Sequence, residues 1–428
     1  KYNYKMIVRN ILVFPCGSEI GLEVYRSVKY SSHFNLIGGS SVDDHGKFVF
    51  SNYIGDIPFI DSPCFIDKIK EIVRDKGIDA IYPTMDSVIA VLKKHEIEIG
   101  CKIVSSDLET VEICLSKSRT YKTLKGTVNT PKVYEQHEIN IFPVFAKPDI
   151  GYGSRGVKLI TSKQELEEHS KKNKNVLYCE YLSGDEYTVD CFTDKKGKLM
   201  FYLPRQRRRI QKGISVNTIE VPDNKGEFKE IVERINNRIK FRGAWFVQLK
   251  RDDNNILTIL EIAARFGGSS SLSRAKGVNF SLLSLYDAFD YETEIIQNNY
   301  VVEVDRALNN KYKIDLSYNE VFVDFDDCIL IKEEINTNLI AFIFQCINRN
   351  IKITLLTRHK NDIETSLGKY RILNVFDRII HIKDKTPKSY YIDNKNSILI
   401  DDSFAERQDV WKNKKIAVFS PDMIDCLI

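Results

Sequence analysis

Short apolar segments alternate with amphipathic helical segments over roughly the first 125 residues, and this alternation leaves few folds open. Strands that alternate with helices predict a parallel, doubly wound sheet. Such a sheet binds ligands beyond the carboxyl ends of its strands, which here are 15–18 and 83–86. The predicted strands are 10–15, 34–38, 79–83 and 102–105, and the predicted helices are 19–28, 65–76, 86–95 and 107–124.

The pattern changes twice further along the chain. After about residue 130, strands follow one another with few helices, which predicts an antiparallel-rich α+β domain. From residue 318, strands again alternate with helices, which predicts a second, smaller doubly wound unit. The expected fold class is therefore a multidomain α/β and α+β protein with domains at 1–126, 127–316 and 317–428. The predicted strands are 144–147, 157–160, 176–180, 187–192, 199–203, 245–250, 256–262, 321–325, 352–356, 397–400 and 415–419, and the predicted helices are 162–172, 228–239, 280–289 and 336–348.

Composition excludes several classes of protein. The 428 residues are 43% hydrophobic and 29% charged, which excludes an intrinsically disordered chain. Lys and Arg number 63 against 59 Asp and Glu, so the net charge of +4 is too small to argue for nucleic-acid binding. The nine cysteines form no CxxC pair, which argues against a disulfide framework or a zinc knuckle. No apolar run or signal-like segment predicts a membrane partner, so a reduced, cytoplasmic setting is expected.

A glycine-rich segment, Gly151-Tyr-Gly-Ser-Arg-Gly156, matches the spacing GxGxxG. A dinucleotide-binding loop must follow a strand and open a helix. This segment follows one predicted strand and precedes another, so a hairpin loop is expected. Backbone N–H groups of such a loop can approach a triphosphate closely, and Lys147 and Arg155 can neutralise its charge. A flexible hairpin without a ligand is the alternative.

Two polar residues interrupt neighbouring apolar strands of the second domain. Gln248 and Glu261 lie on strands 245–250 and 256–262, where their oxygens could hold Mg²⁺ between two phosphates. An unpartnered carboxylate in the apolar run ILEIAA would be costly, which favours a functional role for Glu261. Gln248 as an ordinary edge residue is the alternative.

The order of these features resembles the ATP-grasp superfamily over roughly residues 8–316. The resemblance is carried by Ala-Lys-Pro with GYGSRG at 146–156, by CEYLSGDEYTVD at 179–190 and by EIAARFGG at 261–268. It is similar in particular to carboxylate–amine ligases such as one half of the carbamoyl phosphate synthetase large chain. The first domain is then the pre-ATP-grasp domain, and the second is the ATP-grasp domain. Since such relatives often dimerise, the resemblance also leaves a homodimer open.

The resemblance implies a role for each matching residue. Lys117, or Arg119 in its place, would make the first phosphate contact. Glu180 would lie at the adenine hinge, and Glu186 would accept the ribose hydroxyls. Arg265 would stabilise the transferring phosphoryl group. The implied phosphate-binding set is Lys117, Lys147, Gly151, Gly153, Ser154, Arg155 and Gly156, and the implied metal ligands are Gln248 and Glu261 for Mg²⁺, which Mn²⁺ could replace.

One departure and one basic run bear on the ligase prediction. The family usually has Asn two residues after the metal-binding Glu, but this chain has Ala263, so one oxygen ligand is missing. The run Arg205–Arg209 lacks interleaved aromatic residues, so a nucleic-acid stripe is the weaker interpretation. In ATP-grasp ligases this region faces the acceptor, so Arg207 and Arg209 are expected to bind a carboxylate substrate.

The last domain places acidic or polar residues at four predicted strand ends. VFVDFDD ends in Asp324 and Asp326, ITLLT ends in Thr357, and SILIDD ends in Asp401 and Asp402. Two acids at one strand end repel each other unless a cation lies between them. A Lys-rich predicted helix start, with Lys383, Lys385 and Lys388, lies between the last two motifs.

These motifs, in this order, resemble the haloacid dehalogenase-like (HAD) phosphatase family over about 318–428. The resemblance implies that Asp324 is a nucleophile that forms an aspartyl phosphate and that Asp326 is the general acid and base. Thr357 and Lys388, with Lys385 as the alternative, would hold the phosphoryl oxygens. Asp401 and Asp402 would bind Mg²⁺ together with Asp324. About 25 residues separate the first two motifs, so a Rossmann-like domain without a large cap is expected, and Cys328 is a mild departure from the motif.

The sequence therefore predicts a bifunctional enzyme. An ADP-forming ligase would join a carboxylate to an amine through an acyl phosphate, and a Mg²⁺-dependent phosphatase would act on a phosphorylated metabolite. One alternative is a degenerate ATP-grasp domain, marked by Ala263, that binds ATP and regulates the phosphatase. Another is a non-enzymatic nucleic-acid binder that uses the arginine run.

Overall fold

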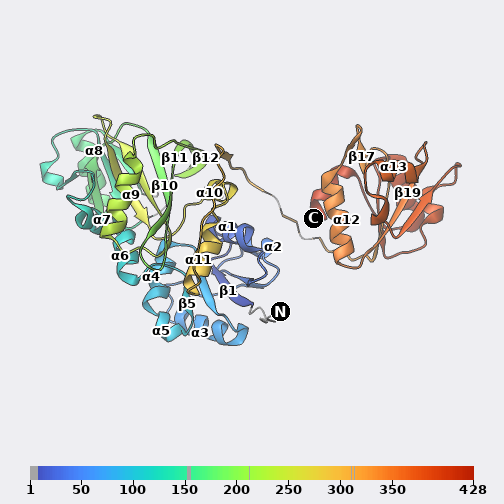
Figure 1. Cartoon of the computed structure of the whole chain (residues 1–428), viewed down its shortest axis with the longest axis horizontal. Coiled ribbons are helices and arrows are strands. Elements are labelled where there is room, and N and C mark those ends of the chain that lie inside the picture. The colour runs from blue at the N-terminus through green and yellow to red at the C-terminus, as the bar shows by residue number, and fades with distance from the viewer. Residues whose placement is uncertain (1–7, 152–155, 212, 310, 313) are drawn as a thin grey trace. The chain divides into compact units, whose positions relative to one another are not determined.

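The computed structural model describes residues 8–151, 156–211, 213–309, 311–312 and 314–428. The chain divides into two compact units, Lys1–Asn309 (unit 1) and Asn310–Ile428 (unit 2), which are described separately (Figure 1). The boundary expected near residue 126 falls inside unit 1. Among the described residues, no helix is both long and apolar enough to cross a membrane.

Unit 1 begins with a five-stranded parallel sheet in the order β3-β2-β1-β4-β5, which confirms the doubly wound prediction. The central strand β1 is fully buried at Ile11, Leu12 and Val13, because helices cover both faces of the sheet. Its strands are β1 (Arg9–Phe14), β2 (Phe34–Gly39), β3 (Tyr53–Ile54), β4 (Ala80–Pro83) and β5 (Lys102–Ile103). Its helices are α1 (Glu19–Val28), α2 (Gly46–Val49), α3 (Phe65–Lys76), α4 (Asp86–Lys94) and α5 (Glu96–Ile99).

The single helix predicted at 107–124 is wrong, since two helices stand there: α6 (Leu108–Leu115) and α7 (Lys117–Leu124). Ser116 separates them with an extended backbone, and its side chain accepts a hydrogen bond from the Arg119 N–H at 3.2 Å. A serine at an N-cap satisfies a free helical N–H and so favours a new helix start. The Ser116 hydroxyl also donates to Asp149 at 2.8 Å, which fixes the start of α7 beside the glycine-rich hairpin.

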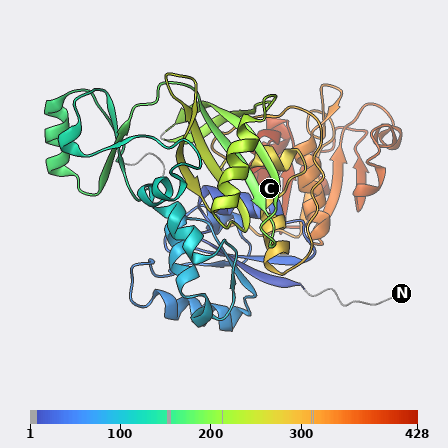
Figure 2. The ribbon, with the colours of Figure 1, turned by 60° about the vertical axis from the view of Figure 1, so that its left-hand side comes forward.

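Two antiparallel sheets follow in unit 1, as the α+β prediction requires. The smaller sheet, with α8, stands out as a lobe beside the larger one (Figure 2). The small sheet has the order β6 (Val133–Tyr134), β9 (Val176–Glu180), β7 (Val144–Pro148), β8 (Lys158–Ile160). The short helix η1 (Gln136–Glu138) connects β6 to β7, and α8 (Lys163–Lys172) covers the sheet. The large sheet has the order β14 (Leu257–Ala263), β13 (Gly243–Arg251), β10 (Glu186–Thr193), β11 (Leu199–Gln211), β12 (Ile214–Glu220), β15 (Glu303–Asp305).

Helices pack the large sheet against its neighbours. Helix α9 (Glu227–Arg238) buries Val232 and Ile235 in one core with Trp245 of β13. Helix α11 (Phe280–Ala288) instead shares a core with the first sheet, where Phe280 joins Val13 of β1. Because this core is common to both parts, residues 8–309 pack as one unit rather than as two tethered domains. The short helix α10 (Ser271–Ala275) completes unit 1.

Unit 2 is a second parallel sheet in the order β20-β19-β16-β21-β22, so the prediction of a small doubly wound unit is confirmed. The predicted helix start at Lys383–Lys388 is wrong, because residues 384–387 form a loop and only a short 3₁₀-helix begins at Lys388. The sheet consists of β16 (Glu320–Val323), β19 (Lys352–Thr357), β20 (Arg378–His381), β21 (Ser397–Ile400) and β22 (Ala417–Phe419). The other elements are the hairpin β17 (Leu330–Ile331) and β18 (Glu334–Ile335), α12 (Thr337–Asn348), α13 (Ile363–Lys369), α14 (Phe404–Lys414), η2 (Leu373–Val375), η3 (Lys388–Tyr391) and η4 (Pro421–Cys426).

Candidate functional sites

The glycine-rich segment connects two antiparallel strands, as predicted. β7 pairs with β8 from Val144 opposite Ile160 to Ala146 opposite Lys158. Gly151 and Gly156 frame the loop, and Gly156 has a φ of 73°, which favours glycine. Gly153, Ser154 and Arg155 lie outside the described residues. The hairpin is thus established, whereas its phosphate contacts stay a prediction.

Lys147 is a buried cation at the base of this hairpin. Its ammonium donates to the hydroxyl of Tyr121 at 2.6 Å and to the carbonyl of Leu260 at 3.4 Å. Burial lowers the pKa of Lys147, and the nearby positive charge of Lys117 lowers it further. No carboxylate forms a salt bridge with Lys147 among the described residues, so its charge is free to meet an anion. Sequence reasoning did not identify Tyr121, because a tyrosine in an amphipathic helix carries no motif.

Lys117 brings the hairpin and the large sheet together. Its ammonium lies 3.5 Å from the carbonyl of Gly151 and 4.0 Å from a carboxylate oxygen of Glu261. Arg119, the alternative first phosphate contact, pairs instead with Glu112 at 3.0 Å and is half exposed. The structure therefore groups Lys117, and not Arg119, with Lys147 and Glu261.

The predicted metal ligands stand opposite each other. Gln248 of β13 is the register partner of Glu261 of β14, and Ala263 pairs with Phe246 further along the same ladder. Ala263 is buried and offers no oxygen, so the ligand missing from the sequence motif is not replaced at that position. Carboxylate and amide oxygens at Glu261 and Gln248 fit the preference of Mg²⁺ for oxygen ligands.

Glu180 and Glu186 flank the connection between the two antiparallel sheets. Glu180 ends β9 of the small sheet and accepts a hydrogen bond from the Lys132 N–H at 2.9 Å. Glu186 begins β10 of the large sheet and accepts a hydrogen bond from Arg207. The two carboxylates thus lie at the two ends of the short segment that connects β9 to β10. The adenine base and the ribose of ATP are expected to bind beside this segment.

Arg207 contacts two residues that were predicted to bind the nucleotide and the metal ion. Its guanidinium donates to Glu186, to Gln248 at 3.2 Å and to the carbonyl of Gly213 at 2.8 Å. It therefore belongs to the cluster predicted for nucleotide and metal. Arg209 does not join it, because a register shift between the two residues turns Arg209 to Asp305 at 2.6 Å. Arg207 and Arg209 thus have different partners, and the binding of a carboxylate substrate by either of them stays a prediction.

The remaining arginines of the run also have acidic partners. Arg205 is buried and binds both oxygens of Asp190, at 2.7 and 3.1 Å, and Arg208 contacts Glu303 at 3.4 Å. Each of the four arginines in the run is thus paired with a carboxylate, and the pairs of Arg208 and Arg209 are exposed.

Arg265 points from the end of β14 toward the first sheet. Its guanidinium donates to Asp86 at 2.7 Å and to the carbonyl of Phe266 at 3.2 Å. Asp86 begins α4, directly beyond the carboxyl end of β4. The Nε atom of Arg265 is buried without a hydrogen-bond partner among the described atoms. Arg265 thus contacts the first sheet at a strand end, where a doubly wound sheet binds ligands.

We call Lys117, Lys147, Glu186, Arg207, Gln248 and Glu261 the nucleotide cluster. Its members come from α7, β7, β10, β11, β13 and β14. Contacts or strand pairing among the described residues link all of them except Lys147, whose pKa nevertheless responds to the charges of Lys117 and Glu261.

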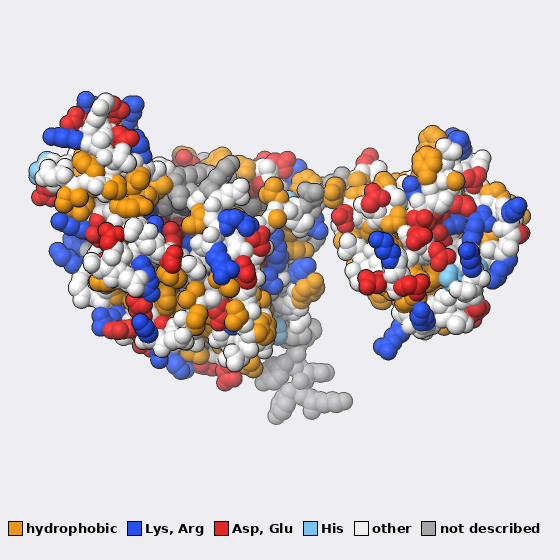
Figure 3. Space-filling view, turned by 90° about the horizontal axis from the view of Figure 1, so that it is seen from above, with side chains coloured by type: hydrophobic (Ala, Val, Ile, Leu, Met, Phe, Trp, Pro, Cys, Tyr) orange, Lys and Arg blue, Asp and Glu red, His pale blue; other side chains and the backbone are white. Residues whose placement is uncertain are grey.

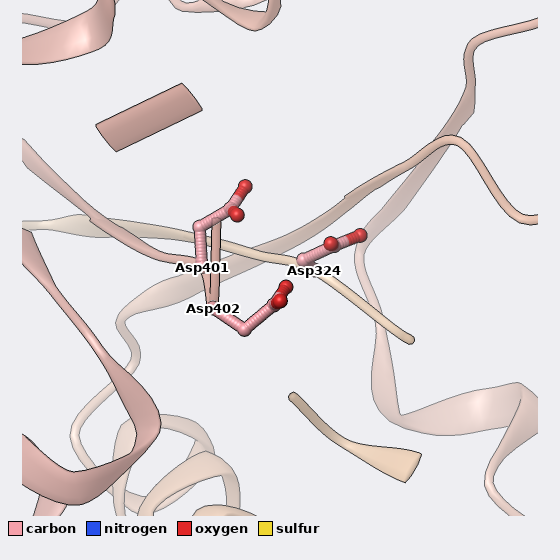
Figure 4. Close-up of side chains that lie close together, drawn as sticks. All are labelled: Asp324, Asp401 and Asp402. Atoms are coloured by element: carbon pink, nitrogen blue, oxygen red, sulfur yellow. The ribbon is translucent and has the colours of Figure 1, made fainter. Parts of the chain in front are cut away.

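Unit 2 holds a separate group of carboxylates, which we call the acid cluster. Ligand oxygens of Asp324, Asp401 and Asp402 all lie within 4.8 Å of one another (Figure 4). Asp324 follows β16, and Asp401 and Asp402 follow the adjacent strand β21, so one sheet edge supplies all three. Acidic side chains also gather on the face of unit 2 that is seen in Figure 3. The trio supplies the all-oxygen donor set that Mg²⁺ requires.

Lys388 is the cation of this cluster. Its ammonium lies 2.6 Å from Asp401 and 3.1 Å from Asp324. Burial alone would lower the pKa of Lys388, but Asp324 and Asp401 outweigh burial and raise it. The pKa of Asp401 is raised to about 6: burial is the largest cause and the charge of Asp324 adds to it, while Lys388 opposes the shift. Three carboxylates facing one ammonium leave an excess of negative charge, which a divalent cation would relieve.

Thr357 and Asp326 complete the residues predicted in unit 2. Thr357 is fully buried at the end of β19, next to β16, and Asp326 lies two residues beyond Asp324. Asp326 forms a hydrogen bond with Nδ1 of His359 at 2.9 Å, and sequence reasoning missed this histidine. A histidine two residues after a strand end could have been noticed, although nothing in the sequence indicates its partner. Lys385 makes no hydrogen bond or salt bridge among the described contacts, whereas Lys388 is buried beside two aspartates.

Comparisons with known proteins support an ATP-grasp assignment for unit 1. Residues 172–312 match a family described as "ATP-grasp in the biosynthetic pathway with Ter operon", which covers about a third of the chain. D-alanine–D-alanine ligases of Fusobacterium nucleatum and Thermotoga maritima are both 27% identical, over 156 and 143 residues. These matches cover 34% and 31% of this chain, and the chain spans only about half of those proteins, 54% and 47%.

Solved structures give the fold. The biotin carboxylase domain of Hydrogenobacter thermophilus 2-oxoglutarate carboxylase, solved with MgADP and bicarbonate, aligns with a TM-score of 0.59 at 15% identity, over 69% of this chain and 74% of that one. Staphylococcus aureus N5-carboxyaminoimidazole synthetase aligns with a TM-score of 0.56 at 18% identity, over 69% and 80%. Unit 1, with 309 of the 428 residues, accounts for a similar share of the chain. The chain is therefore similar to ATP-grasp proteins: residues 172–312 match an ATP-grasp family model, and the fold resembles those of the two solved structures.

Proposed function

We propose that unit 1 is an ADP-forming ligase that activates a carboxylate as an acyl phosphate and passes the acyl group to an amine. The nucleotide cluster carries the proposal, because it groups cations with two oxygen ligands around the base of a glycine-rich hairpin. Both types of relative support it: the curated relatives are named as ligases, and one solved neighbour holds MgADP.

The cluster suggests a division of labour. Lys117 and Lys147 would neutralise the phosphates, while Gln248 and Glu261 would hold Mg²⁺ between them. The ion would supply charge neutralisation of the transferring phosphoryl group. Glu186 would accept the ribose hydroxyls after release from Arg207, which then becomes free to contact a phosphate. Arg265, which contacts Asp86 beyond the carboxyl end of β4, would stabilise the charge of the transition state.

We further propose that unit 2 is a HAD-like phosphatase. The acid cluster supports this role, since Asp324, Asp401 and Asp402 offer a divalent cation three carboxylates beside the buried Lys388. Asp324 would attack the phosphorus of a phosphomonoester and release the alcohol, and water would then hydrolyse the aspartyl phosphate. The ion would supply electrostatic stabilisation of the phosphoryl oxygens.

A substrate panel tests both proposals in the intact chain. ADP release is measured with ATP, Mg²⁺ and combinations of sugar acids, amino acids and amines, and phosphate release is measured separately with phosphomonoesters. The proposal expects ADP release that requires both a carboxylate and an amine. ATP binding by calorimetry without ADP release in any combination would favour the alternative, in which unit 1 senses ATP and regulates the phosphatase. The buried Ala263, which replaces an oxygen ligand, is the observation behind that alternative.

A further inference from the structure

His359 is a buried histidine beside the proposed phosphatase site. It lies two residues beyond Thr357, and only 9% of its side chain is exposed. Its backbone N–H donates to the Thr357 hydroxyl at 3.3 Å, and its carbonyl accepts a hydrogen bond from His381 at 2.7 Å. The ring of Phe325 packs edge-on against it, with centroids 5.0 Å apart. These contacts fix the position of the imidazole.

Both nitrogens of His359 have partners. Nδ1 lies 2.9 and 3.0 Å from the two carboxylate oxygens of Asp326, and Nε2 lies 2.8 Å from the hydroxyl of Ser366 on α13. Because both carboxyl oxygens face Nδ1, at least one of them can accept whether or not the other carries a proton, which favours a proton on Nδ1. A neutral imidazole then accepts from Ser366 through Nε2. One tautomer therefore satisfies all three groups.

The exposure of the two partners differs. The side chain of Asp326 is 49% exposed, whereas that of His359 is 9% exposed. The histidine is enclosed and the carboxylate is accessible from outside. The buried imidazole can therefore orient a carboxyl group that a substrate can reach.

We propose that His359 is a positioning residue that holds the carboxyl group of Asp326 for proton transfer to the leaving alcohol. The inference rests on the proposed phosphatase function. As Asp324 forms a bond to phosphorus and the P–O ester bond breaks, the protonated Asp326 gives its proton to the departing oxygen. Water then attacks the aspartyl phosphate and returns a proton to Asp326. His359 donates from Nδ1 throughout and neither gains nor loses a proton.

A matched pair of amide variants separates the two contacts of His359. In His359→Asn the side-chain N–H₂ lies near the position of Nδ1 and can still donate to Asp326. In His359→Gln it lies near Nε2 and reaches Ser366 instead. The two variants are similar in polarity, so they differ mainly in which partner is kept.

Two esters with different leaving groups provide the readout. β-Glycerophosphate releases a basic alkoxide that needs a proton, whereas p-nitrophenyl phosphate releases a stable phenolate that does not. We expect His359→Gln to lower kcat for β-glycerophosphate about 10²-fold, the usual contribution of a general acid. We expect a change below about threefold for p-nitrophenyl phosphate and for both KM values, and His359→Asn is expected to retain most of the activity, since it keeps the hydrogen bond to Asp326.

Each outcome decides the question. Equal losses in the two amide variants, or equal losses with the two esters, would overturn the role of His359 while leaving the phosphatase in place. If the unaltered chain hydrolyses neither ester, or only p-nitrophenyl phosphate, acid assistance is absent and the inference falls. Hydrolysis of neither ester also counts against the phosphatase itself. If circular dichroism shows that His359→Gln does not fold, Ser366→Ala replaces it. We then expect kcat to fall several-fold for β-glycerophosphate but not for p-nitrophenyl phosphate. An equal fall in kcat for both esters would contradict the proposal.

Discussion

The nucleotide cluster of unit 1 and the acid cluster of unit 2 are suited to ligands of opposite charge. In unit 1, burial lowers the pKa of Lys147, whose nearest polar partners are a hydroxyl and a carbonyl. In unit 2, burial raises the pKa of Asp401 to about 6. The first site thus holds a cation that an anion would stabilise, and the second holds carboxylates that a divalent cation would stabilise. The comparison teaches that a buried charge without enough opposite charge around it can indicate that the site binds a ligand of the opposite sign.

The sites also differ in how they are assembled. The acid cluster comes from the ends of two adjacent parallel strands, β16 and β21. The nucleotide cluster draws on six elements and two sheets. We therefore expect a single substitution in the acid cluster to abolish most of the phosphatase activity. Single substitutions in the nucleotide cluster should instead lower ADP formation by different amounts.

The largest expected effect is that of Asp324→Asn. An amide cannot form the aspartyl phosphate, so phosphatase turnover should fall by more than about 10⁴-fold. Phosphate release from a phosphomonoester measures it. ADP formation serves as the control and should stay unchanged; a parallel loss of both activities would show that the two sites are not independent.

A large effect is also expected from Lys147→Ala. Loss of the buried cation should lower ADP formation about 10²- to 10³-fold, by analogy with the removal of one transition-state donor. Tyr121→Phe is the matched control, since it removes the hydroxyl partner at 2.6 Å and keeps the ammonium. The two variants should differ at least tenfold in kcat/KM for ATP, and similar values would argue against a phosphate contact by Lys147.

A graded effect is expected from the pH dependence of Mg²⁺ binding to unit 2. The pKa of Asp401 is raised to about 6, so the folded chain binds a proton there more tightly than the unfolded chain does. This proton stabilises the fold relative to the ionised form, and the stabilisation is lost as pH rises from about 4 to about 6. Protons compete with Mg²⁺, so its affinity should fall up to about tenfold per pH unit below pH 6.

Calorimetry of Mg²⁺ binding at pH 5, 6 and 7.5 measures this competition. Asp401→Asn should weaken Mg²⁺ binding and remove most of the pH dependence. An unaltered pH dependence in that variant would assign the proton to another group.

The smallest effects are expected from the arginine pair. Arg207→Ala should raise the KM for ATP about tenfold or less, because it frees Glu186 and Gln248 but removes one cation. Arg209→Ala should change KM less than about twofold, since this residue forms an exposed ion pair with Asp305. Steady-state ADP formation with varied ATP measures both KM values, and equal effects of the two substitutions would contradict the different roles of Arg207 and Arg209.

Much of the fold could be predicted because it depends on local patterns. Parallel strands with buried faces, such as β1 and β16, form continuous apolar runs between helices. The extension of β11 through the arginine run could not be predicted, because its charges are neutralised by acids on neighbouring strands. Strand β15, three residues long, has no pattern of its own and exists through pairing with β12.

In the candidate sites, too, the residues that follow a local sequence pattern could be predicted, whereas contacts between distant residues could not. Asp324, Asp401 and Lys388 could be identified as a group from strand ends and their order, and the structure brings them together. The pairing of Arg207 with Glu186, and of Arg265 with Asp86, depends on which strand faces which. Such contacts between residues far apart in the chain leave no trace in local sequence.

The central claim is that one chain holds a triphosphate site in unit 1 and a separate phosphoester site in unit 2. A crystal structure of the chain with Mg²⁺, a non-hydrolysable ATP analogue and orthovanadate tests it most directly. The account predicts the triphosphate between Lys117, Lys147 and Glu261, and vanadate beside Asp324 with Mg²⁺ on the acid cluster. A nucleotide bound away from Lys147, or vanadate absent from Asp324 while Mg²⁺ is present, would contradict it.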